Sequence, residues 1–139
     1  YAARHEDNNI RKFEDIGTRC GPTIAAIGQA LDFYEQIGPD RKAARLRYLL
    51  SLVMNDLDGT PDVRVITERD PKKRTGLARI VVEGLSGADL TTVLREEFDI
   101  YTYGNWPGPN DGVYISPNVF NSSDHMTAFS NAIKEIAAR

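Results

Sequence analysis

The chain of 139 residues has a single cysteine, Cys20, and no long apolar run. One cysteine excludes an internal disulfide framework and suits a reducing cytosol, so we expect a cytoplasmic protein. No apolar stretch approaches the roughly 18 residues that cross a bilayer, and the polar start of the chain lacks the pattern of a signal peptide. We therefore expect no membrane partner.

Strong charge of one sign is also missing. The formal net charge is -3, and the longest basic cluster, Lys72-Lys73-Arg74, follows Asp70-Pro71 as in a solvated turn. This balance disfavours a surface for nucleic acid, so we expect no nucleic-acid partner. His5 and His125 lie far apart without metal-ligand spacing around either, and we predict no metal site.

Patterns of self-contained catalysis are missing too. No paired carboxylates, Gly-rich phosphate loop or Ser-His-Asp pattern stands out, and the lysines have polar neighbours rather than the desolvated setting that lowers the pKa of a reactive amine. Cys20 follows Arg19 near a predicted helix start, which would lower its pKa, but no base is placed beside it. We favour a buried or inert thiol, and we predict no catalytic residue in this chain.

The apolar content of 41% suffices for one domain with a core. Apolar residues recur at helical spacing after Gly21-Pro22 and again after Gly38-Pro39-Asp40, which predicts two long helices with a break between them. Alternation from Val63 to Thr67 and the β-rich run from Leu77 to Val82 then predict two strands.

The second half of the chain has patterns of both helices and strands. Ser86 and Asp89 resemble a capping box before a helix, and Asn121-Ser122-Ser123 caps a last helix. Ile100 to Tyr103 and Val113 to Ser116 predict two more short strands. Strands grouped between helices, without regular βαβ alternation, indicate an α+β fold. We predict a small, mostly antiparallel sheet of three to four strands, covered on one face by helices and preceded by two long helices.

Two motifs carry a family resemblance. The first is Lys12-Phe13-Glu14-Asp15-Ile16-Gly17-Thr18, and the second is Gly112-Val113-Tyr114-Ile115-Ser116-Pro117-Asn118. Their order and spacing resemble the C-terminal part of class V aminotransferase-like enzymes, above all the isopenicillin-N-epimerase-like branch. The resemblance runs from about Arg11 to about Ile136. It implies the small domain of a fold-type-I enzyme that depends on pyridoxal phosphate.

This resemblance implies that most of the active site lies outside the chain. Such enzymes carry the lysine that holds the cofactor upstream of this region, so pyridoxal phosphate would be bound mainly by a missing large domain. The chain begins with Tyr1 rather than Met, and we expect it to be cut from a longer protein. We predict that residues 1–20 lead in from the large domain, that residues 21–139 form the C-terminal small domain, and that this chain alone is inactive.

Gly17 and Thr18 are the predicted cofactor-binding residues. A hydroxyl and free backbone N–H groups before a helix can hold a phosphate, although a turn with a helix cap explains the same residues. In class V relatives, a Gly-Thr at this place reaches the cofactor phosphate of the other subunit. The resemblance therefore implies a homodimer in the intact protein.

Tyr114, Tyr103 and Asn105 are the predicted substrate-binding residues. In the resembling enzymes the position of Tyr114 is usually an arginine that clamps the substrate's α-carboxylate, and tyrosine offers only one neutral donor. A different substrate, an arginine supplied elsewhere or lost activity would each explain the change. Tyr103 and Asn105 either line the substrate entrance or lie at a domain interface. The related cysteine desulfurases carry a reactive cysteine in this loop, and its absence disfavours persulfide transfer.

The resemblance implies transamination, epimerisation or a carbon–sulfur or other β-elimination on an amino-acid-like substrate. The alternative is a stand-alone, non-catalytic interaction or regulatory module that retains the fold. The complete reading frame distinguishes them, because only the enzyme requires a large domain with its lysine upstream.

Overall fold

The structure, a computed structural model, describes residues 20–104 and 107–139, and its described part is an α+β fold. Gly17, Thr18 and Asn105 lie outside the described residues. The elements are, in chain order, α1 (Gly21–Ile37), α2 (Pro39–Asp56), β1 (Val63–Val65), β2 (Ala78–Val82), α3 (Gly87–Phe98), β3 (Val113–Ile115) and α4 (Ser123–Ala137). The predicted fold class is confirmed, including the two helices that precede the sheet.

The chain divides after Gly38 into two compact units. In the first, α1 begins after Cys20 with a proline in its first turn, where the missing N–H has no helical partner anyway. It ends at Gly38, whose φ of 86° is a conformation that glycine adopts without steric cost. No residue of α1 is buried, so its apolar stripe is exposed.

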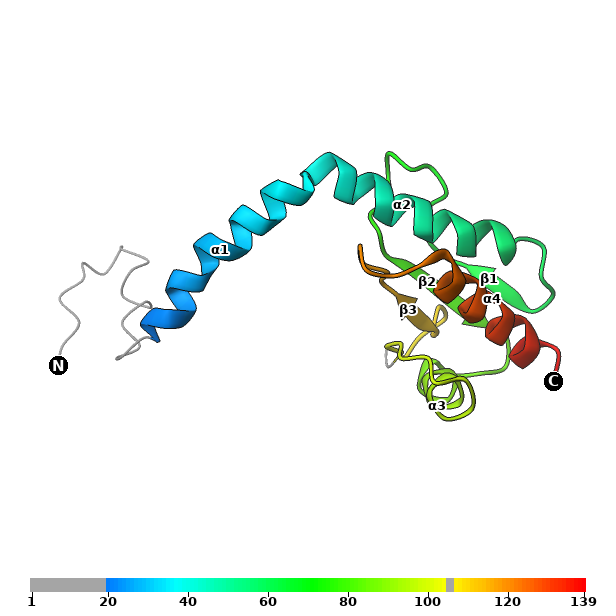
Figure 1. Ribbon diagram of the computed structural model, residues 1–139. Coiled ribbons are helices and arrows are strands. Elements are labelled where there is room, and N and C mark those ends of the chain that lie inside the picture. The colour runs from blue at the N-terminus through cyan, green and yellow to red at the C-terminus, as the bar shows by residue number, and fades with distance from the viewer. Residues whose placement is uncertain (1–19, 105–106) are drawn as a thin grey trace, which may run out of the picture. The chain divides into compact units, whose positions relative to one another are not determined.

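In the second unit, an antiparallel sheet with the order β1-β2-β3 forms the centre (Figure 1). Ile80 in the middle strand pairs with Val65 of β1 and with Val113 of β3. Because side chains alternate along a strand, this register puts one apolar row on a single face. The row consists of Val63, Val65, Ala78, Ile80, Val82, Val113 and Ile115.

Helices α2, α3 and α4 cover that face. They add apolar side chains at helical spacing to the same hydrophobic cluster, among them Leu49, Leu50, Val53, Met54, Leu90, Leu94, Met126, Phe129, Ile133 and Ile136. Helices α2 and α4 pack against each other, and Lys134 Nζ in α4 lies 2.7 Å from Asp56 Oδ1 in α2. The predicted cover of helices on one face is therefore confirmed.

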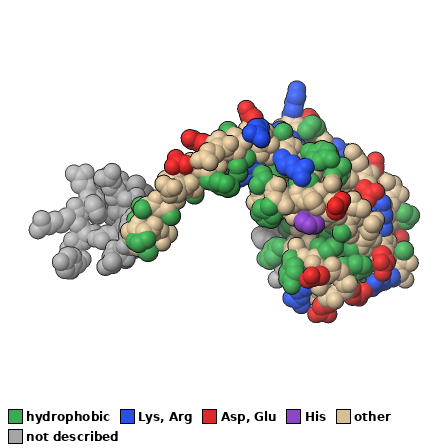
Figure 2. All heavy atoms as spheres, viewed as in Figure 1, with side chains coloured by type: hydrophobic (Ala, Val, Ile, Leu, Met, Phe, Trp, Pro, Cys, Tyr) green, Lys and Arg blue, Asp and Glu red, His purple; other side chains and the backbone are tan. Residues whose placement is uncertain are grey.

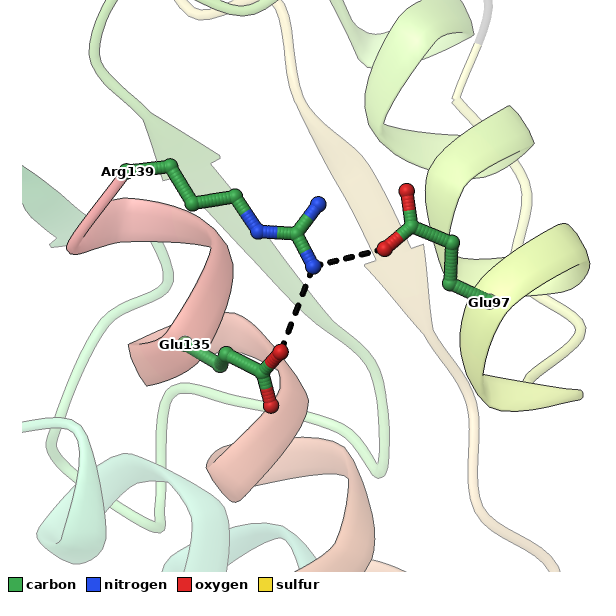
Figure 3. A network of polar contacts seen from close by, with 3 residues as sticks. All are labelled: Glu97, Glu135 and Arg139. Atoms are coloured by element: carbon green, nitrogen blue, oxygen red, sulfur yellow. Dashed lines mark hydrogen bonds and ion pairs between the residues drawn. The ribbon is translucent and has the colours of Figure 1, made fainter.

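The ends of α3 and α4 are fixed by caps and by one polar network. The hydroxyl of Ser86 accepts from the N–H of Asp89, as predicted, and Ser122 forms a capping box with His125. After α4, Arg139 Nη2 lies 2.6 Å from Glu97 Oε2 of α3 and 3.2 Å from Glu135 Oε1 of α4 (Figure 3). This ion pair connects the last turns of two helices that are distant in sequence.

The predicted strand from Ile100 to Tyr103 is wrong. Asp99 ends α3 with a left-handed φ of 54°, and the N–H of Ile100 is taken by Leu94 O as part of the helix C-terminus. Only Tyr103 aligns with the sheet, as an isolated antiparallel bridge to Tyr114. Pairing therefore starts too late in this segment to extend the sheet to a fourth strand.

Candidate functional site

The face of the sheet that the helices leave uncovered carries polar and aromatic side chains. They occupy positions between the core residues, namely Arg64 in β1, Arg79 in β2 and Tyr114 in β3, and the buried Val81 of β2 lies on the same face. The register places Arg79 directly opposite Tyr114, whereas Arg64 lies opposite Val81. Because directly paired residues point to the same side, Arg79 and Tyr114 are neighbours on this open face.

Two of the predicted site residues meet here. The backbone N–H of Tyr114 donates to the carbonyl oxygen of Tyr103 at 2.7 Å, which puts the two residues opposite each other. The Tyr103 side chain is 63% exposed. The structure thus brings Tyr103 and Tyr114 together at the edge of the sheet.

Two adjoining grooves lie beside this tyrosine pair. One, of about 560 Å³, extends toward α4 and includes Phe120 and His125, and the other, of about 620 Å³, includes Leu77 and Tyr103. Both are lined by Tyr101, Thr102, Tyr114 and Ser116. Apolar walls with a few polar groups are typical of sites for small organic ligands.

Arg79 is the site residue that the sequence analysis missed. Its guanidinium carbon lies 4.5 Å from the centroid of the Tyr114 ring, within the range of a cation–π contact. Its Nε and Nη2 atoms are buried and have no hydrogen-bond partner among the described residues. The available signal was an arginine in an otherwise apolar strand, Ala78-Arg79-Ile80-Val81-Val82, at a position that alternates away from the core.

Close backbone packing holds this corner in place. A Cβ atom at Gly112 would collide with the carbonyl oxygen of Ile80, and one at Gly104 would collide with the carbonyl oxygens of Gly87 and Gly112. Such approaches are open to glycine alone. They fix the segment that ends in Tyr103 against the start of β3, and so they fix Tyr103 beside Tyr114.

Cys20 and His125 are two further residues that the sequence analysis considered. Cys20 is exposed, so of the two predicted alternatives, a buried or an inert thiol, the buried one is wrong. The thiol makes no capping hydrogen bond, but interaction with the Thr23 side chain, and then with the Thr23 backbone, lowers the pKa of Cys20. His125 is exposed on α4 and lines the groove of about 560 Å³.

Neither sign of charge dominates the face of the second unit that Figure 2 shows. Figure 2 shows acidic and basic side chains interspersed with hydrophobic ones over the visible face of the second unit. Within residues 20–104 and 107–139, no three His, Cys, Asp or Glu side chains gather as a metal site would require. No helix in the same ranges is both long and apolar enough to cross a membrane.

Comparison with known proteins places these features in a family. The sequence model for the family described as aminotransferase class-V matches residues 3–104. A comparison with curated proteins found no match.

Three solved structures have a similar fold. A cysteine desulfurase from Thermococcus onnurineus NA1, in its apo form, is 24% identical with a TM-score of 0.68, over 75% of this chain and 28% of its own. A cysteine desulfurase from Escherichia coli is 18% identical with a TM-score of 0.74, over 87% and 31%. An alanine–glyoxylate aminotransferase from Nostoc sp. is 18% identical with a TM-score of 0.63, over 82% and 30%. The chain thus spans less than a third of each of these structures.

Proposed function

Because this chain belongs to the aminotransferase class-V family, we propose that it is the C-terminal small domain of a pyridoxal-phosphate-dependent enzyme. The family match over residues 3–104 is the observation that carries the proposal. It is supported by a fold shared with solved structures of which the chain covers less than a third. On this proposal the missing part is a large domain with the lysine that holds the cofactor, and the intact enzyme is cytoplasmic.

The domain's own contribution is a wall of the substrate pocket. When bound, pyridoxal phosphate withdraws electrons from the amino-acid substrate, and the protein orients the reacting groups around it. Tyr103 and Tyr114 supply aromatic surface and two phenol groups beside grooves of about 560 and 620 Å³. Asn105, in the same loop by sequence, is proposed to complete this wall.

Gly17 and Thr18 are proposed to bind the cofactor phosphate held by a second subunit, which makes the enzyme a homodimer. The start of helix α1, which follows these two residues, is suited to a negatively charged group. Helix α1 begins at Gly21 and has no acidic residue in its first turn, so the positive end of its dipole is not neutralised by a carboxylate.

The reaction is proposed to be a transamination, an epimerisation or a β-elimination on an amino-acid-like substrate. Two of the similar structures are cysteine desulfurases. No cysteine occurs from Tyr103 to Asn110, and Cys20 lies at the start of α1, so we do not extend persulfide chemistry to this chain. The proposed affiliation with the isopenicillin-N-epimerase-like branch agrees with that absence.

Cofactor binding by the complete polypeptide tests the proposal. The protein expressed from the whole reading frame should show the visible absorbance band of bound pyridoxal phosphate, whereas residues 1–139 alone should show none and should be inactive. A reading frame without a large domain, or a complete protein without the band, would favour the alternative of a non-catalytic interaction or regulatory module.

A further inference from the structure

We infer that Arg79 supplies the carboxylate-binding guanidinium of this site, from the strand beside the position where the resembling enzymes place it. The proposed ligand is the α-carboxylate of an amino-acid-like substrate, and in this respect the assignment rests on the proposed function. Tyr114 then acts as the platform on which the guanidinium lies rather than as a substitute for it.

The donors that lack a partner are the pair suited to a carboxylate. In arginine, Nε–H and one Nη–H point the same way and match the two oxygens of a carboxylate. Nε and Nη2 of Arg79 are both buried without a hydrogen-bond partner among the described residues. Buried donors left unpaired are costly, which is why nearly all of them in folded proteins have an acceptor. A ligand carboxylate would supply two acceptors at once.

The rest of the Arg79 side chain is already held in place. Its guanidinium stacks on the Tyr114 ring at 4.5 Å, and its backbone N–H donates to Thr67 Oγ1 at 3.0 Å while its carbonyl oxygen accepts from Ile66 N at 3.0 Å. These contacts restrain the group before any ligand arrives, so that binding a carboxylate loses less conformational entropy.

The groove of about 620 Å³ is the proposed route to this group. Arg79 does not itself line the groove, but Tyr114, on whose ring the guanidinium lies, does. Leu77, which lies two residues before Arg79 on the same face, and Tyr114 both line it. The side chains of Tyr101 and Tyr103, also in its lining, are 78% and 63% exposed. A ligand that enters beside these exposed rings would approach Tyr114 and the guanidinium that stacks on it.

Arg64, on the same face of the sheet, has a structural role and serves as a comparison for Arg79. Its Nε forms an ion pair with Glu83 Oε1 across the β1–β2 pair. Arg79, in contrast, forms no ion pair with a described residue. Arg64→Met is therefore a matched control, since it removes the same charge from the same face without touching the fork.

Propionate and propionamide are suitable probes, because they have nearly the same shape and only the first is a carboxylate. Their binding to the complete protein with its cofactor is measured by calorimetry, and the visible absorbance of the cofactor is recorded on the same samples. We expect propionate to bind more tightly, and Arg79→Met to reduce this preference roughly 10- to 100-fold, the value of charge-assisted hydrogen bonds. Arg64→Met should leave it unchanged.

Two further variants separate binding from folding. Arg79→Lys keeps the charge but not the fork and should retain only part of the preference. Tyr114→Phe keeps the stacking ring and should retain all of it. Arg79→Met together with Tyr114→Arg moves the guanidinium to the neighbouring strand and should restore the preference, which a misfolded variant could not do.

The outcomes are distinct. Equal binding of both probes by the unsubstituted protein, or an undiminished preference in Arg79→Met, would overturn the assignment while a normal cofactor band leaves the proposed function intact. A preference that depends on Arg79 in a protein without the cofactor band would instead support the assignment and contradict the proposed function.

Discussion

The two faces of one small sheet differ in almost every property, although the same three strands build both. On the covered face, Ile80 and Val113 are fully buried in one cluster with side chains of α2, α3 and α4. On the open face, Arg79 stacks on Tyr114 and keeps two donors that have no partner among residues 20–104 and 107–139. The first face is filled by side chains of the domain itself, whereas the second face keeps hydrogen-bond donors that a ligand can use.

This difference indicates that the residues for stability and the residues for binding lie on opposite faces of the sheet. A strand alternates its side chains, so a substitution at one position affects the core and a substitution at the next affects the site. The covered face should govern folding, and the open face should govern recognition. The predictions below test this separation, beginning with the largest expected effect.

Ile80→Ala should give the largest loss of stability. Ile80 has no exposed surface and lies at the centre of the sheet, between Val65 and Val113. Removing its buried carbon atoms should lower the free energy of unfolding by about 2–5 kcal/mol. Urea denaturation followed by circular dichroism measures this value. A loss no greater than that of Tyr114→Phe would contradict the separation of the two faces.

Gly112→Ala should disturb both faces at once. Its added Cβ would meet the carbonyl oxygen of Ile80, which is backbone and cannot turn away. We expect a loss of roughly 1–3 kcal/mol, together with weaker propionate binding because β3 carries Tyr114. Gly28→Ala in α1 is the control, since nothing lies within 4 Å of the added carbon. Equal unfolding curves for both variants would show that β3 can shift freely.

Tyr114→Ala should affect stability much less than it affects binding. The change removes the ring on which Arg79 lies, a contact worth roughly 0.5–1 kcal/mol at exposed sites and about 2 kcal/mol when desolvated. The preference for propionate should fall because the guanidinium loses its support. The calorimetric titration is compared with that of Tyr114→Phe, and a fall of the same size in both variants would assign the effect to the hydroxyl instead of the ring.

Glu97→Gln should produce the smallest effect, and that effect should depend on pH. Hydrogen bonding to Arg139 lowers the pKa of Glu97 below its ordinary value. The stabilisation is thus fully present above the unfolded pKa, about 4.3, and is lost as the pH falls through the folded pKa. The urea midpoint of the variant should be slightly lower at neutral pH and equal in acid. Glu96→Gln, which removes the neighbouring 3.3 Å pair with Arg95, is the control, and a gap that widens in acid would contradict the sign.

The sequence predicted the helices and the core best, because helical spacing and capping residues act locally. The break at Gly38-Pro39, the cap at Ser86 and the cap before the last helix were each identified from neighbours within a few positions. These signals need no knowledge of distant contacts. The strand predicted from Ile100 to Tyr103 was wrong because composition alone does not reveal that Ile100 still bonds to α3.

The site was predicted only in part for a related reason. Tyr103 and Tyr114 were identified through the family motif and its loop, and the bridge between them follows from chain topology. Arg79 lies 35 positions before Tyr114 in the printed sequence, so its contact depends on the register between β2 and β3. The pattern of residues within one strand does not reveal which residue it faces on the next strand. Arg79 could therefore be assigned to the site only from the structure.

Chemical reduction of the complete protein, loaded with pyridoxal phosphate, tests the central claim most directly. Borohydride would fix the cofactor to the lysine that holds it, and mass spectrometry of the digested protein would locate that lysine. We predict a modified lysine upstream of Tyr1 and none among Lys12, Lys42, Lys72, Lys73 and Lys134. A cofactor attached to one of these five residues, or no attachment anywhere in the protein, would contradict the account of this chain as the small domain of such an enzyme.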